Sequence, residues 1–411
     1  MSKPAQQIGL LGAVAIGIAS MLGAGVFSVF SAAYASAGPF LFLSLLVAGL
    51  TSSLNAASVY QLAKKHSRPG GVYSYARAEW NETASYVAGI AFLLGKVGSI
   101  AAIGLIFGEY VWPEQPKLAA TLAIVTLAAL NSLGINRTSF AAFVLAAITS
   151  TYLLISGLAG ATHESTASPN VFDMAADSSA QGVLPAAALL FFAFAGYARV
   201  ATLGDEVRDA KRNIPRAIWI SLSGALFIYV LIAFALTNTL GATLQEASDS
   251  IAKMNAISLA GVPPWVTFLV ASGASLGSML ALLAGISRTA ATMAEDRELN
   301  IVFAKRNRFG APWVAELAIA MGALAILFGG IYLPWIIGFS SFSVLIYYAI
   351  GHVSSYLSGK HSVGRLLVQC VGFLLCLLLV FSVPGPAVWV STLILVAAVA
   401  IRALVWHRKE R

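Results

Sequence analysis

The sequence predicts an all-α integral membrane protein with about twelve transmembrane helices. Hydrophobic residues make up 59% of the 411-residue chain and charged residues only 10%, whereas soluble domains carry about 25% charged residues. Uncharged or nearly uncharged runs long enough to cross the hydrocarbon core as helices recur along the chain. These runs are continuous and rich in Leu, Ala and Ile, which favours helices over the alternating strands of a membrane β-barrel.

The predicted spans follow one another with short connections. In chain order they cover residues 8–35, 39–62, 84–112, 117–134, 139–160, 183–203, 216–239, 264–293, 314–330, 334–357, 363–382 and 386–406. The first run has the position of a secretory signal peptide. Because another apolar run follows almost at once, without a clean cleavage site, we expect it to be retained as the first helix.

The basic residues are distributed asymmetrically over the predicted loops. The chain carries 25 Lys and Arg against 17 Asp and Glu. With a cytoplasmic N-terminus and twelve spans, only Lys117 and Lys253 fall in outer loops. Arg288 and Arg402 lie at inner helix ends, and Lys96 and Arg199 are left inside spans. The positive-inside rule accounts for this asymmetry. We therefore expect a multi-pass protein of the bacterial cytoplasmic membrane, with both termini in the cytoplasm and the lipid bilayer, not nucleic acid, as its partner.

Two predicted spans carry glycine-containing interruptions five spans apart. The first contains Gly23-Ala24-Gly25, and the sixth contains Phe192-Ala193-Phe194-Ala195-Gly196-Tyr197. Small residues in membrane helices often serve close helix packing, but the matching positions favour two inverted repeats whose first helices are broken at mid-membrane. Half-helix N-termini suit a carboxylate, and the exposed carbonyls of the other ends suit an ammonium group. The pair of interruptions therefore predicts a site for an α-amino acid.

Four segments resemble signatures of the amino acid–polyamine–organocation (APC) superfamily. Gly23–Phe27 is similar to G-[SA]-G-[IV]-F of its helix 1, and residues 191–218 are similar to its helix 6 signature. Pro69–Tyr75 resembles its P-x-G-G-x-Y-x-Y loop, and residues 287–297 resemble the end of its helix 8. The matches keep their order along most of the first ten predicted helices.

The resemblance implies the LeuT-type fold and transport by alternating access. It implies a first five-helix repeat over 1–160, an outer loop over 161–182, a second inverted repeat over 183–357, and two peripheral helices with a cytoplasmic tail over 358–411. The substrate carboxylate would meet the first interruption and the substrate ammonium the second. The predicted substrate-binding residues are Met21, Gly23, Ala24, Gly25, Phe192, Ala193, Phe194, Ala195, Gly196 and Tyr197.

The usual residues of a coupling-ion site are not evident. Where many family members carry a glutamate after F-x-G-[FY], this chain has Ala198. Helix 5 has no charge near residues 148–150, and helix 8 offers at most Ser275 or Ser278 as hydroxyl ligands for sodium.

Two cations within spans are instead candidates for coupling or gating. A charge at the bilayer centre costs about 3 kcal/mol by insertion scales, so Lys96 must face protein or water. It binds a carboxylate, replaces a coupling cation, or holds helix-end carbonyls as a structural lysine. Arg199 is an inner gate, or it snorkels or pairs with Asp205 or Glu206.

We expect a secondary active transporter without a cofactor or metal, coupled to protons or working by exchange. The apolar lining by Met21, Phe192 and Phe194 favours a neutral amino acid, whereas Lys96 would favour an acidic one. Export, or transport of cationic amino acids or polyamines, is the alternative on the same fold. More remote alternatives are a lipid-modifying membrane enzyme, for which the usual motifs are lacking, and a non-transporting amino-acid sensor.

Overall fold

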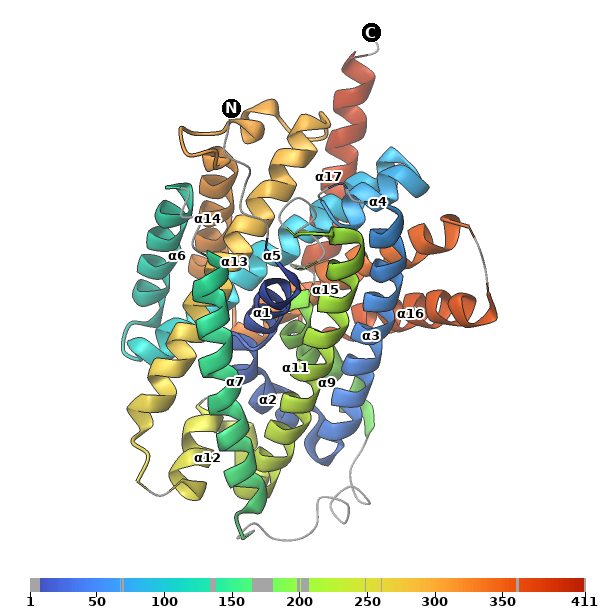
Figure 1. Cartoon of the computed structure of the whole chain (residues 1–411). Coiled ribbons are helices and arrows are strands. Elements are labelled where there is room, and N and C mark those ends of the chain that lie inside the picture. The colour runs from blue at the N-terminus through green and yellow to red at the C-terminus, as the bar shows by residue number, and fades with distance from the viewer. Residues whose placement is uncertain are drawn as a thin grey trace.

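The computed structural model describes residues 8–66, 68, 70–133, 138–164, 180–197, 200, 207–247, 249–259, 261–359 and 362–409 (Figure 1). Apart from turns and one isolated bridge between Ile8 and Val207, these residues form helices. Nine described segments are long and apolar enough to cross a membrane, and two shorter apolar helices accompany them. The all-helical class is thereby confirmed, while the inverted repeat stays a prediction.

The helices coincide with the apolar runs. The first run holds two helices, α1 (Leu10–Met21) and α2 (Ala24–Ala37), and the sixth begins with α9 (Val183–Phe194) and the 3-10 turn η3 (Ala195–Tyr197). The other long or apolar helices are α3 (Leu41–Lys65), α5 (Glu82–Val111), α6 (Pro116–Ser132), α7 (Thr138–Thr162), α11 (Ala210–Leu240), α13 (Pro264–Glu295), α14 (Trp313–Phe328), α15 (Leu333–Leu357), α16 (Val363–Ser382) and α17 (Ala387–Lys409).

Two short helices were not expected from the apolar runs. They are α4 (Val72–Glu79) and α12 (Ser250–Ser258), and both lie in segments that connect the long helices. The turn into α4 uses Gly70 and Gly71, whose φ angles of +112° and +59° lie in the region that glycine adopts without steric cost. The two glycines thus allow the turn into α4, of which Val72–Ala76 are buried.

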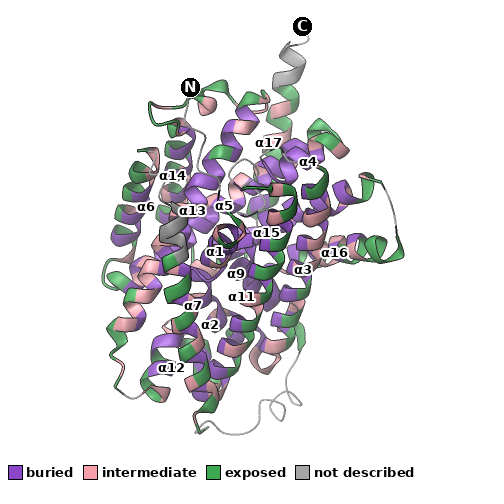
Figure 2. Ribbon diagram, in the orientation of Figure 1, coloured by how far each residue is buried: buried purple, intermediate pink, exposed green. Residues whose placement is uncertain are grey.

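The packing places α5 at the centre of the molecule. It contacts α13, α15 and α6, while α1 packs against α11 and α7, and α2 packs against α9. Buried residues concentrate on these inward faces, and the outer faces expose large apolar side chains such as Phe227 and Leu269 (Figure 2). Lipid accepts such a surface, because it offers the apolar side chains an apolar solvent.

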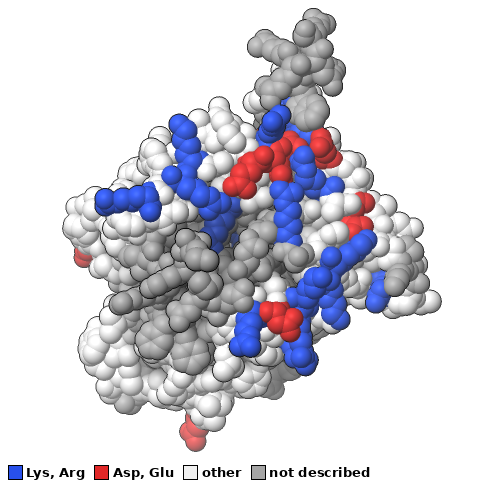
Figure 3. Space-filling view, turned by 45° about the horizontal axis from the view of Figure 1, so that its top comes forward, with Lys and Arg blue, Asp and Glu red and all other residues white. Residues whose placement is uncertain are grey.

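Lys and Arg gather on the face near which the chain begins and ends (Figures 1 and 3). Some of these cations tie the chain together: Arg77 pairs with Glu298 at 3.0 Å, and Arg402 pairs with the same carboxylate at 2.8 Å. These ion pairs join α4 and α17 to the segment that follows α13.

Candidate substrate-binding site

The first interruption separates α1 from α2 at Leu22 and Gly23. The Leu22 N–H still donates to the Ile18 carbonyl at 2.7 Å, but Gly23 is non-helical and precedes the first turn of α2. A Cβ atom on Gly23 would lie 1.9 Å from the Ser278 Oγ of α13. Glycine is therefore required here by the close approach of α13. The first N–H groups of α2 lack partners within the helix, as at any helix N-terminus.

The second interruption lies directly against the first. At η3 the chain leaves the α-helical path, and a Cβ atom on Gly196 would lie 2.4 Å from the backbone carbonyl group of Ser20. The Tyr229 hydroxyl of α11 lies 2.6 Å from the Met21 carbonyl oxygen and 2.9 Å from that of Ala193, and it donates its proton between the two. One side chain thus connects the ends of α1 and α9.

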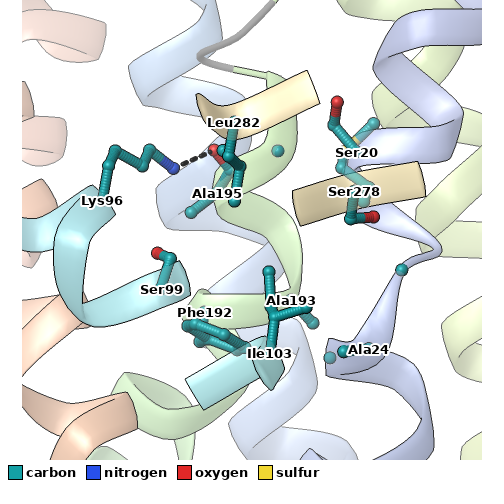
Figure 4. A pocket seen from close by; sticks show the side chains of 14 residues that line it. Ser20, Ala24, Lys96, Ser99, Ile103, Phe192, Ala193, Ala195, Ser278 and Leu282 are labelled. Carbon is teal, nitrogen blue, oxygen red and sulfur yellow. Dashed lines mark hydrogen bonds between the residues drawn. The ribbon is translucent and has the colours of Figure 1, made fainter. Parts of the chain in front are cut away.

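A cavity of about 20 Å³ lies between the two interruptions (Figure 4). Most of the predicted residues line it: Met21, Gly23, Ala24, Gly25, Lys96, Phe192, Ala193, Ala195 and Gly196. This volume holds about one water molecule. An amino acid therefore fits only after the surrounding helices move apart.

Two predicted residues, Phe194 and Tyr197, are not among those that line the cavity. The Phe194 ring packs edge-on against Tyr229 with centroids 4.9 Å apart, and the Tyr197 ring stacks on Tyr348 of α15 at 5.3 Å. Both side chains are buried. The structure places these aromatic residues beside the interruption as packing contacts. Arg199, with Asp205 and Glu206, lies outside the described residues.

Lys96 reaches the cavity from α5. Its side chain is 2% exposed, and its Nζ donates to the Ala195 carbonyl oxygen at 2.9 Å (Figure 4). Among the described residues that line the cavity, none is acidic. Of the alternatives for this lysine, the structure shows the bond to a helix-end carbonyl, and it places that bond inside the candidate site.

Sequence reasoning missed several lining residues: Ser20, Ser99, Ile103 and Leu282. Ser99 and Ile103 follow Lys96 at the spacing that places residues on one helix face. They could therefore have been predicted from the position of Lys96. Ser278, considered beforehand only for sodium, donates to the Ala19 carbonyl at 2.7 Å and so holds α13 against the end of α1.

Helix interruptions that meet around a small cavity inside a bundle of apolar helices are typical of a membrane protein with a small-molecule site. The family model described as "Amino acid permease" matches residues 12–407. The chain belongs to this family, and the predicted APC resemblance is confirmed. The family and its transporter-named relatives support amino acid transport and point to a transporter, not an enzyme.

Several relatives carry names of transporters or permeases. A protein of Mycobacterium tuberculosis named as an uncharacterized transporter is 39% identical over 419 residues, which cover 99% of this chain and 93% of the relative. Cationic amino acid transporter 5 of Arabidopsis thaliana is 26% identical, with 77% and 59% covered. A branched-chain amino acid permease of Bacillus subtilis is 24% identical, with 55% and 53% covered.

Proposed function

We propose that this protein is a secondary active transporter that moves a neutral amino acid across a bacterial cytoplasmic membrane by alternating access. The observation that carries the proposal is the meeting of two helix interruptions around one buried cavity. Unwound backbone exposes peptide groups that can bind a ligand, and at membrane depth it is tolerated only where it is buried in protein or lines a cavity.

The two sides of the cavity suit the two charges of an α-amino acid. The N–H groups at Gly23–Gly25 begin α2 and attract a carboxylate. The carbonyl groups at the end of α9 and in η3, including that of Ala195, attract an ammonium group. A zwitterion would bridge the interruptions and satisfy both sets of peptide groups.

The lining selects between side-chain classes. Ile103, Leu282, Met21 and Phe192 offer apolar contact, and the described lining residues include no carboxylate for a distal cation. The names of the relatives include both cationic and branched-chain amino acids. The apolar lining favours the second class, because an unpaired cation in such a pocket is costly.

The topology is proposed with the same assignment. We expect twelve spans, with 1–160 and 183–357 as inverted repeats and 358–411 as a peripheral pair with its tail. The face near which the chain begins and ends gathers Lys and Arg (Figure 3), which favours its placement in the cytoplasm. Because the cavity holds only about one water molecule, the helix pieces at the interruptions must separate from α5 and α13 to admit substrate.

Counterflow in proteoliposomes tests the function. Vesicles holding a mixture of unlabelled amino acids receive one labelled amino acid at a time, and we expect transient accumulation of a neutral, apolar one. A complete panel without accumulation, from protein that remains monodisperse in detergent, would reject amino acid transport.

Gly196→Ala links counterflow to the interruptions. The added Cβ would meet the Ser20 backbone at 2.4 Å, so the closed arrangement cannot form, and we expect at least a tenfold loss of rate. Gly224→Ala in α11 is the matched control, because a Cβ there meets nothing within 4 Å. Equal rates for the two variants would show that the contact between the interruptions is irrelevant to transport.

A further inference from the structure

Lys96 is bonded to the carbonyl group that the substrate ammonium would bind. In the closed structure its Nζ donates to the Ala195 carbonyl oxygen at 2.9 Å, and both residues line the cavity. Under the proposed function, this carbonyl is among those that receive the substrate ammonium. Two cationic ammonium groups therefore compete for one end of the site.

The described surroundings of Lys96 supply no anion to hold both cations. From α14, the Glu316 carboxylate accepts bonds from Asn131 and Ser132 of α6 and Ser287 of α13. From α15, the His352 ring bonds to Asn55 and Ser58 of α3. The surrounding elements also carry the tyrosines Tyr347 and Tyr348 of α15, Tyr197 of η3 and Tyr229 of α11. Further charged groups lie toward the helix ends: Glu82 and Glu109 of α5, and Arg288 and Glu295 of α13.

The charge balance then decides the protonation state of Lys96 in the loaded site. In the empty site the lysine charge has the Ala195 carbonyl as its partner. A zwitterion brings no net countercharge, so once its ammonium takes that carbonyl, occlusion would bury the lysine charge without this partner. Burial of an unpaired ion costs several kcal/mol. Loss of one proton from Lys96 removes the excess charge, and the neutral amine gains a lone pair that can accept a bond from the substrate ammonium.

We infer that substrate binding displaces the Lys96 proton, so that the transporter exchanges one amino acid for one proton. This inference rests on the proposed function. On the side where substrate enters, the Lys96 ammonium gives its proton to water, and the substrate ammonium takes the Ala195 carbonyl. On the other side the substrate leaves, Lys96 takes a proton from water, and its ammonium returns to the same carbonyl. The N–H bond is the only covalent bond that breaks and forms.

The test uses the full-length protein in proteoliposomes, with the membrane potential clamped at zero by equal potassium on both sides and valinomycin. With an acidic interior and sodium absent, the wild type should accumulate the amino acid identified by counterflow. The expected limit for one-to-one exchange is about tenfold for each unit of pH difference, since one pH unit corresponds to 1.36 kcal/mol. Solubilised protein in weak buffer should release about one proton for each substrate bound.

Two substitutions at Lys96 separate a titrating lysine from a fixed cation. Arginine keeps its charge at any working pH, so Lys96→Arg should lose both counterflow and pH-driven accumulation. Lys96→Gln has no proton to lose, so it should keep some counterflow, lose accumulation driven by the pH gradient, and release no proton on binding. Thermal unfolding of both solubilised variants checks that they are folded.

The outcomes distinguish the inference from the function. Wild-type counterflow with no response to the pH gradient would overturn the proton exchange and leave amino acid transport standing. An active Lys96→Arg variant would overturn it too, and if that variant prefers acidic amino acids, Lys96 is a carboxylate-binding cation. Absence of all counterflow in the wild type would remove the proposed function and the inference with it.

Discussion

The Tyr229 hydroxyl connects the two helix interruptions, and its removal should loosen the closed cavity. In Tyr229→Phe the Met21 and Ala193 carbonyl oxygens, now 2.6 and 2.9 Å from the hydroxyl, lose their shared donor. A buried polar group left unsatisfied costs about 1–3 kcal/mol. If opening the cavity returns these carbonyls to water, the closed state loses this energy relative to the open one. The open fraction then rises roughly 5- to 150-fold.

The assay is thiol labelling inside the cavity. Ser20 lines the cavity, so Ser20→Cys, in a background where Cys370 and Cys376 are replaced, reports opening through its rate of modification. We expect Tyr229→Phe to raise this rate by the factor derived above.

Tyr110→Phe is the matched control. The Tyr110 hydroxyl is also buried and donates to a carbonyl, that of Phe27 within α2, at 3.0 Å. This carbonyl belongs to α2, and its bond to Tyr110 does not join the two interruptions, so labelling should change little. Equal labelling rates in the two variants would refute the idea that Tyr229 holds the interruptions together.

Three further predictions concern the helix contacts around the site and the charged face. Ser278→Ala removes the bond from α13 to the Ala19 carbonyl. The loss of about 1 kcal/mol of binding free energy should raise the dissociation constant of the substrate roughly fivefold. Ser275→Ala loses only a bond within α13 and should leave that constant unchanged, so equal dissociation constants for the two variants would contradict this. Glu298→Gln breaks the ion pairs to Arg77 and Arg402 of a carboxylate that is 1% exposed, and it should lower the free energy of unfolding by about 3 kcal/mol. Glu295→Gln breaks an exposed ion pair and should lower it by less than about 1 kcal/mol. Thermal unfolding of both variants measures the difference. Burial acts to raise the pKa of Glu79, but Lys65 and His66 outweigh it and hold the pKa below its usual value. The stabilising contribution of the ionised Glu79 is therefore full above the unfolded pKa of about 4.3 and is lost as the pH falls through the folded pKa. This loss should appear as faster hydrogen exchange in α4 below pH 4, and it should be absent in Glu79→Gln.

The helices were predictable because a membrane span must satisfy its backbone internally over a length set by the bilayer. Because of that requirement, each span appears in the sequence as an apolar run of about the same length. The connecting helices α4 and α12 are short and lie outside these runs, so hydropathy did not reveal them. The first interruption was predictable from its glycines, and the contact distances at Gly23 and Gly196 supply the reason for them.

The orientation of single side chains was less predictable. Phe194 and Tyr197 were expected to face the substrate, but their rings pack against Tyr229 and Tyr348. That direction depends on packing against α11 and α15, which sequence spacing does not contain. Likewise, the position of Lys96 in a span predicted a partner, but only the fold brings it to the Ala195 carbonyl across 99 residues of chain.

The most direct measurement is an experimental structure of the protein in lipid nanodiscs, bound to the amino acid that shows counterflow. The account predicts that the substrate carboxylate lies at the N–H groups of Gly23–Gly25, with the substrate ammonium at the Ala195 carbonyl and the Lys96 amine beside it. A substrate bound elsewhere, or a continuous helix through Gly23 with Lys96 unmoved on Ala195, would contradict it.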